Sequence, residues 1–140
     1  MGGVLAIDLG AEKSGFAWVD AARICCVPLD VVRAAEGSDE LLAHIASLLE
    51  EHDFDTLLAG LPLHADGAES ERATATRAFL TRVGERFPQL SLHTHDEHGT
   101  TKEAEARLRE AGYTGREAKA RRDSWSALVI LEDWLSAGEP

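Results

Sequence analysis

Four carboxylates stand where acidic side chains could do chemistry. Asp8 ends a short apolar run, Asp96 and Glu97 close a later one, and Asp123 lies in a segment with helical spacing. Carboxylates gathered at one place repel one another unless a divalent cation lies between them, and Mg²⁺ binds one or two of them together with substrate phosphates. Two such ions ~4 Å apart stabilise the attacking and leaving oxygens in phosphodiester hydrolysis. These residue types suggest metal-assisted hydrolysis, provided that the fold brings them together.

Each acid also has a purely structural interpretation. Asp8 could cap the turn that follows its strand, and the Asp96-Glu97 pair could be a charged strand end. Counting back in helical steps from Trp134 reaches Asp123, at the margin of an apolar stripe. Because burying a bare charge is costly, Asp123 needs a metal or a cationic partner. Its sequence neighbours Arg121 and Arg122 are the candidates for a simple salt bridge.

The elements that must position these acids follow from the hydrophobic pattern. Three β-type runs joined by short turns predict an antiparallel meander. Helical periodicity then alternates with two short strands before two final helices, which predicts the order βββ-α-β-α-β-α-α. Strands are expected at 4–7, 16–19, 23–32, 56–59 and 90–94, and helices after Ser38, at about 69–86, and after the capping boxes Thr100-x-x-Glu103 and Thr114-x-x-Glu117.

This order predicts an α/β fold with a mixed five-stranded sheet flanked by helices, in which the crossovers make the later strands parallel to the first. Asp8 and the Asp96-Glu97 pair would then share the edge at which open α/β sheets bind ligands. The length of 140 residues fits one domain, 1–140. No apolar run reaches the ~20 residues of a membrane span, and the first residues do not resemble a signal peptide. A cytoplasmic protein with no membrane partner is expected.

Charge gives a mixed indication about nucleic acid. The formal net charge of −11 argues against binding a polyanion. Residues 100–125, however, contain seven basic and five acidic side chains, a local excess of +2 that leaves −13 on the rest. A polyanion could therefore approach that face alone, and the candidates for backbone contacts are Arg116, Lys119, Arg121 and Arg122.

The remaining polar and aromatic residues give weaker indications. His98 follows the acid pair and could contact a phosphate or donate a proton, whereas a metal site at His93 and His95 is disfavoured. Trp125 could stack on a base, although a place in the core is the simpler interpretation. No serine has a convincing base beside it, so water is the expected nucleophile.

With these motifs in order, the chain resembles the YqgF family, also called RuvX, whose members are described as Holliday junction resolvases or pre-16S ribosomal RNA nucleases. The resemblance covers about residues 4–135 and rests on Val4-Leu5-Ala6-Ile7-Asp8-Leu9-Gly10 with Gly15 and Ala17, Gly60-Leu61-Pro62-Leu63 with Asp66-Gly67, Asp96-Glu97 with Thr100-Thr101, and Asp123 before Ala127 and Ile130-Leu131. One departure is His98-Gly99, where the family usually has Arg and Leu.

The resemblance implies an RNase H-like fold in a bacterial cytoplasmic protein that cleaves RNA or branched DNA with divalent metal. It implies catalytic roles for Asp8, Asp96, Glu97 and Asp123. We expect Mg²⁺ or Mn²⁺, as two ions, bound by Asp8, Asp123 and one residue of the middle pair. His98, Thr100 and Thr101 join the four basic residues named above as candidate substrate contacts, and a monomer or weak homodimer is expected.

Two other functions compete with hydrolysis. An actin-like or sugar-kinase ATPase shares the Asp-x-Gly turn, but such enzymes clamp ATP between two domains of this kind. The second is a catalytically weak or inactive RNase H-like module that binds RNA or a ribosome-assembly partner. It is favoured by the absence of the family's Arg at position 98 and by the charge of −13 outside residues 100–125. The presence of every expected acid opposes it.

Overall fold

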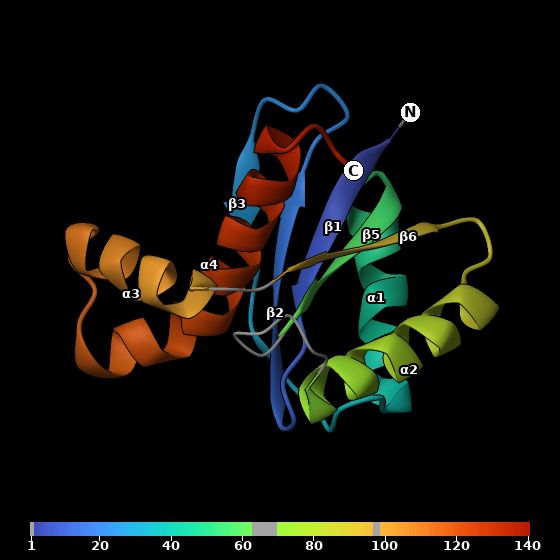
Figure 1. The fold of residues 1–140 in the computed structure, drawn as a ribbon, viewed down its shortest axis with the longest axis horizontal. Helices are drawn as coiled ribbons and strands as arrows, with labels where there is room; N and C mark the ends of the chain where they lie inside the picture. The colour runs from blue at the N-terminus through green and yellow to red at the C-terminus, as the bar shows by residue number, and fades with distance from the viewer. Residues whose placement is uncertain (1, 63–69, 97–98) are drawn as a thin grey trace.

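A computed structural model describes residues 2–62, 70–96 and 99–140 of the chain. The described residues form a mixed sheet with helices on both faces (Figure 1). The elements are β1 (Gly3–Asp8), β2 (Lys13–Val19), β3 (Cys26–Pro28), β4 (Val32–Arg33), α1 (Asp39–Glu51), β5 (Phe54–Leu61), α2 (Glu71–Arg86), β6 (Ser91–Asp96), α3 (Thr100–Glu110) and α4 (Gly115–Ser136).

The sheet has the order β3-β2-β1-β5-β6, and β4 pairs with the other end of β2. The β1, β2 and β3 strands run antiparallel, whereas β5 and β6 run parallel to β1. The predicted combination of a meander and parallel crossovers is therefore confirmed. The apolar β1 lies in the middle, so its carboxyl end, at Asp8, is flanked by strands on both sides.

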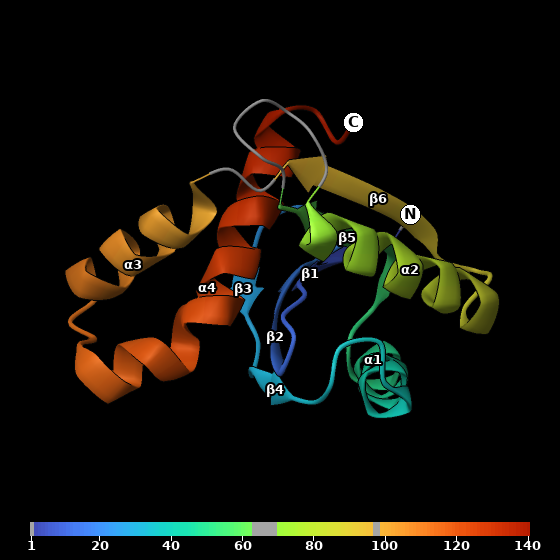
Figure 2. The same cartoon turned by 60° about the horizontal axis from the view of Figure 1, so that its bottom comes forward.

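Side-chain alternation in β1 divides the core into two layers. Leu5 and Ile7 pack on the side of α1 and α2, and Val4 and Ala6 pack against α4 on the opposite side. Figure 2 shows α4 on one side of the sheet and α1 and α2 on the other. Because successive strand residues point to opposite faces, this division also assigns a face to each polar residue at the strand ends.

The third predicted strand, 23–32, is wrong in its extent and is replaced by the short strands β3 and β4, so the described sheet has six strands where five were predicted. The Asp20 carboxylate accepts hydrogen bonds from the backbone N–H groups of Ile24 and Cys25, at 2.8 and 3.1 Å. These two bonds lower the pKa of Asp20. A side chain that satisfies the backbone in this way competes with strand pairing, so the strand begins only at Cys26.

The helix ends were predicted with mixed success. Ser38 caps α1 by accepting from the backbone N–H of Leu41. The capping box proposed at Thr100 is wrong, because α3 begins at that residue and Gly99, with a φ of 75°, is the cap. Thr114 does occupy the N-cap of α4, but its side chain makes no capping hydrogen bond. None of the helices in the described part of the chain combines the length and apolar character needed to cross a membrane.

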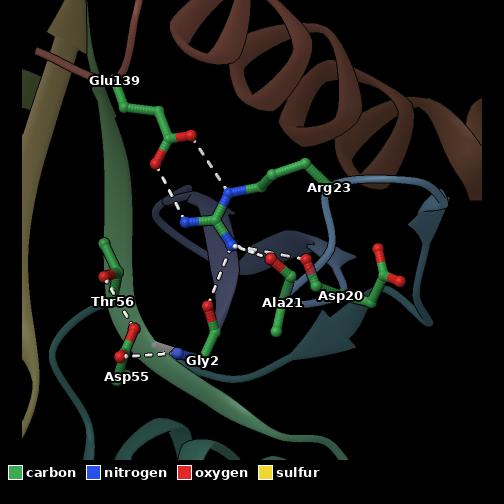
Figure 3. A network of polar contacts seen from close by, with 7 residues as sticks. All are labelled: Gly2, Asp20, Ala21, Arg23, Asp55, Thr56 and Glu139. Carbon is green, nitrogen blue, oxygen red and sulfur yellow. Dashed lines mark hydrogen bonds and ion pairs between the residues drawn. The ribbon is translucent and has the colours of Figure 1, made fainter.

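The two ends of the described chain meet at Arg23 in the β2–β3 turn (Figure 3). Its guanidinium donates two hydrogen bonds to the Glu139 carboxylate, at 3.1 and 2.9 Å, and one to the carbonyl of Gly2 at 2.9 Å. This pairing raises the pKa of Arg23 and lowers that of Glu139. The contact ties the residues after α4 to the start of β1.

Candidate active site

Asp8 lies at the carboxyl end of β1, on the face that α4 covers. Val4 and Ala6 belong to the cluster packed against α4, and strand alternation places Asp8 on the same face. In the antiparallel register, Asp8 is directly opposite Gly15 of β2. The surroundings of Gly15 therefore decide which part of α4 lies beside Asp8.

Gly15 is the point at which the backbone of α4 touches the sheet. A Cβ atom at this position would overlap the carbonyl group of Asp123 and the amide nitrogen of Ser124. The contact is reinforced by a buried hydrogen bond of 3.1 Å, in which the backbone N–H of Phe16 donates to Ser124 Oγ. Glycine in a strand often marks such a close approach, and this signal connects Asp8 with Asp123.

Asp123 is enclosed and has a cationic neighbour. Its side chain is 20% exposed, and Lys13 Nζ lies 3.4 Å from Oδ2. That oxygen is buried and receives no hydrogen bond from the described residues, so its interaction with Lys13 is electrostatic. The prediction that Asp123 lies at the margin of the core-facing stripe is thus confirmed.

The expected partners of Asp123 were the wrong ones. Lys13, from the strand that α4 covers, takes the place proposed for Arg121 or Arg122. Arg121 instead lies over the ring of Tyr113, with its guanidinium carbon 4.2 Å from the ring centre. Helical geometry explains the difference, because residues one or two positions apart on a helix do not face each other.

The turn after Asp8 is held by residues that the sequence did not single out. The backbone N–H of Gly10 donates to Ser14 Oγ at 3.3 Å. Arg72 of α2 donates to the carbonyl of Leu9 at 3.0 Å and forms an ion pair with Glu36. These contacts fix the backbone immediately after Asp8, and only the three-dimensional arrangement reveals them.

Asp96 does not join Asp8 and Asp123. In β6, His93 contacts Trp134 of α4, with ring centres 5.4 Å apart, whereas Leu92 packs with the cluster on the opposite face. Because side chains along a strand alternate between the two faces of the sheet, Asp96 is on the same face as Leu92. Its side chain is exposed. Its predicted partners Glu97 and His98 lie outside the described residues, as do Leu63 and the Asp66-Gly67 turn.

Among the described residues, no group of three or more His, Cys, Asp or Glu side chains is arranged to hold a metal ion. Two carboxylates, Asp8 and Asp123, nevertheless share a face around Gly15. Mg²⁺ usually keeps several waters and binds one or two carboxylates plus substrate phosphates. The buried Oδ2 of Asp123, which accepts no hydrogen bond from the described residues, suits such an ion, so this donor pair fits a divalent cation.

The candidate substrate contacts divide by exposure. Arg116 and Lys119 are exposed on the first turns of α4, and Arg121 and Arg122 are half-buried. Thr100 is only 3% exposed, while Thr101 beside it is exposed. Of the two threonines, Thr101 is therefore the one that solvent or a ligand can reach.

Comparison with known proteins identifies the family. A family model described as RuvX, Holliday junction resolvase, matches residues 2–137. The chain belongs to this family. Two relatives of this RuvX chain are named "Putative pre-16S rRNA nuclease": one from Anaeromyxobacter sp. (strain Fw109-5) is 40% identical, with 94% of each chain covered, and one from Dechloromonas aromatica (strain RCB) is 36% identical, with 98% and 92% covered.

Solved structures agree on the fold. The RuvC protein of T. thermophilus in complex with a Holliday junction substrate matches with a TM-score of 0.55 at 14% identity, covering 97% of this chain and 96% of that one. The Fowlpox virus resolvase, in complex with Holliday junction DNA, matches with a TM-score of 0.59 at 7% identity, covering 99% of both chains. At such low identities these matches establish the RNase H-like fold expected from the sequence.

Proposed function

We propose that this chain is a divalent-metal-dependent nuclease that cleaves RNA, as in the processing of a ribosomal RNA precursor, or branched DNA such as a Holliday junction. The observation that carries the proposal is the convergence of Asp8 and Asp123. The two residues come from elements more than a hundred positions apart, and the contact of α4 with Gly15 places them on one face of the sheet. Membership of the RuvX family supports the same chemistry.

Asp8 and Asp123 would hold Mg²⁺ or Mn²⁺, with the third donor taken from the Asp96-Glu97 pair. The ions, when bound, supply water activation and charge neutralisation at the scissile phosphate. The protein contributes a rigid frame for the donors: Ser124 anchors α4 to β2, and Arg72 and Ser14 hold the turn after Asp8. No side-chain nucleophile is part of this proposal.

Within the middle pair, we assign the donor role to Glu97. Asp96 is on the same face as Leu92, away from Asp8 and Asp123, which leaves Glu97 as the member of the pair to supply the further carboxylate. Substrate phosphates would approach along the first turns of α4, where Arg116, Lys119, Arg121 and Arg122 gather on a chain of net charge −11. His98 and Thr101 would contact the substrate near the acids.

The test is cleavage of single-stranded RNA and of a four-way DNA junction in the presence of Mg²⁺, Mn²⁺ or EDTA. Wild-type protein is compared with Asp8→Asn. A matched control is Asp53→Asn. Asp53 is an exposed acid just before β5, which runs parallel to β1, so it lies at the opposite end of these strands from Asp8. We expect metal-dependent cleavage by the wild type and the Asp53 variant, and none by the Asp8 variant.

Equal cleavage by the Asp8 variant would reject this active site. Absence of cleavage of either substrate by the wild type would favour the second candidate, a non-catalytic module that binds RNA or an assembly partner. The observation behind that alternative is the ion pair between Lys13 and Asp123, which already satisfies part of one carboxylate. Phosphate binding without cleavage would weaken steeply with salt.

A further inference from the structure

A groove beside Asp123 has planar side chains that the proposed cleavage chemistry does not use. One side of it is formed by Pro28, the last residue of β3, and by residues 29–31, which connect β3 with β4. The other side is the flank of α4 that carries Arg121, Ser124 and Trp125. Its volume is about 590 Å³, within the ~300–1,000 Å³ range of small-ligand pockets. Ser124 lines the groove and also accepts the hydrogen bond from Phe16 beside Gly15, so the groove adjoins the contact between α4 and β2 at the candidate active site.

Three flat groups form one wall of the groove. The Arg121 guanidinium lies 4.2 Å from the ring centre of Tyr113, and the Tyr113 and Trp125 rings meet edge to face with centres 6.1 Å apart. Arg121 also donates to the backbone carbonyl of Glu117 at 3.1 Å, which fixes its plane. Aromatic rings and guanidinium planes are the surfaces on which unpaired bases stack.

These three side chains are not simply core residues. Each is half-buried and lines the groove, whereas Ser124 and Ser126, on either side of Trp125, are buried. A large aromatic group thus stays partly at the surface between two small buried residues, of which Ser124 accepts a hydrogen bond from the backbone of β2. This arrangement leaves ring surface available to a ligand.

One basic and one acidic side chain, Arg121 and Asp30, line the groove, and they suit a phosphate and a polar base respectively. Within the part of the chain that the structure describes, Arg121 forms no ion pair with a carboxylate. Lys119 and Arg122 of the same helix line a separate hollow beside α3. Asp30, on the opposite wall, is exposed. It can accept hydrogen bonds from the amino group of a base, as carboxylates do from cytosine N4.

We propose that this groove binds one unpaired nucleotide of a single strand, whose base stacks against the Tyr113, Arg121 and Trp125 wall. The inference rests on the proposed nuclease function and narrows its substrate to strands with an unpaired base beside the cleavage point. A base stacked within a continuous duplex cannot enter, because both of its faces are already covered by its neighbours. The groove would therefore select single-stranded RNA or the unpaired region of a branched substrate.

Binding in EDTA tests the groove without cleavage. The affinity for a short, mixed-sequence single-stranded RNA is measured by fluorescence anisotropy and compared with that for the matching duplex. For Trp125→Ala and Arg121→Gln we expect single-strand affinity to fall about 5- to 150-fold, which is the loss of affinity expected when one base no longer stacks. Duplex affinity should stay unchanged in Trp125→Ala.

Two control variants separate stacking from charge and from folding. Arg86→Gln removes the same charge from a comparable pair on α2, where Arg86 lies 5.5 Å from the ring centre of Phe87, and should bind like the wild type. Trp125→Phe keeps an aromatic face and should retain most of the affinity. Photo-cross-linking of 4-thiouridine RNA to the unmodified chain, mapped by mass spectrometry, should label Tyr113 or Trp125. This measurement needs no variant, so it tests the groove even if Trp125→Ala does not fold.

The outcomes distinguish this proposal from the nuclease function. If the wild type cleaves nothing but binds single strands in a Trp125-dependent manner, the groove stands and the nuclease proposal fails. If the wild type cleaves with metal while Trp125→Ala and Arg121→Gln bind single strands normally, the groove proposal is overturned. Cross-links confined to other parts of the chain, or equal loss of duplex and single-strand binding in Trp125→Ala, would also overturn it.

Discussion

Gly15 of β2 and Asp123 of α4 are in direct backbone contact, and this contact sets the distance between the last helix and the sheet. A Cβ atom on residue 15 would overlap the carbonyl group of Asp123. Because Asp8 pairs with Gly15, the same contact determines how Asp123 approaches Asp8. Any side chain at position 15 must therefore move a carboxylate of the candidate active site.

Gly15→Ala should lower both stability and cleavage. The added methyl group meets helix backbone, which cannot rotate away, and overpacking of this kind costs about 1–3 kcal/mol. Thermal unfolding followed by circular dichroism would measure the first effect and the cleavage assay the second. Gly84→Ala is the matched control: its methyl group would meet only the flexible Leu92 side chain, at 3.2 Å, and helix propensity favours alanine. Normal stability and cleavage in Gly15→Ala would contradict the role given to this contact.

The middle acid pair should show unequal effects. Glu97→Gln is expected to lose metal-dependent cleavage, whereas Asp96→Asn should keep most of it, because Asp96 has the face opposite to Asp8 and Asp123. Initial cleavage rates at saturating Mn²⁺ measure both, with Asp53→Asn as the control. A greater loss in Asp96→Asn than in Glu97→Gln would contradict this assignment and make Asp96 the third donor.

The sequence predicted the order of the elements because hydrophobic periodicity is a local property. The apolar run before Asp8 and the stripe leading back from Trp134 could both be read without knowing their partners. The contacts that complete the site are long-range and leave weaker traces: a glycine within β2 was the only sign that α4 would touch it. The pairing of Lys13 with Asp123 has no local sequence signal, because the two residues are distant in the sequence and meet only in the folded chain.

The error in the third strand has a different origin. The β-branched and cysteine residues of 23–32 favour a strand, but the Asp20 carboxylate takes two backbone donors at its start. Local side-chain chemistry thus prevailed over strand propensity. The same turn places Arg23, with a φ of 60°, where it can reach Glu139.

Lys13→Gln should bind Mn²⁺ more tightly than the wild type. The ammonium group lies 3.4 Å from Asp123 Oδ2, so a divalent ion at this carboxylate must compete with it. Loss of an interaction worth up to about 1 kcal/mol corresponds to roughly a fivefold gain in affinity. Calorimetric titration with Mn²⁺ measures the change, and Lys102→Gln, an exposed lysine on α3, controls for net charge. Weaker Mn²⁺ binding would instead mean that Lys13 positions Asp123 for the ion.

The pair formed by Arg23 and Glu139 should make stability depend on pH. Hydrogen bonds from Arg23 lower the pKa of Glu139 in the folded protein, so the stabilisation is present above the ordinary glutamate pKa of about 4.3 and is lost as the pH falls through the lowered value. For a partly exposed pair the effect is at most about 1 kcal/mol, or roughly 4 °C in Tm. Glu139→Gln should therefore melt a few degrees below the wild type at about pH 7, and the melting temperatures of the two proteins should converge well below about pH 4.

Thermal melts across this range provide the measurement, with Glu50→Gln, an exposed residue of α1, as the control. A difference between wild type and Glu139→Gln that stayed constant with pH would mean that the glutamate stabilises the chain through packing, because only the ionised carboxylate can act through Arg23.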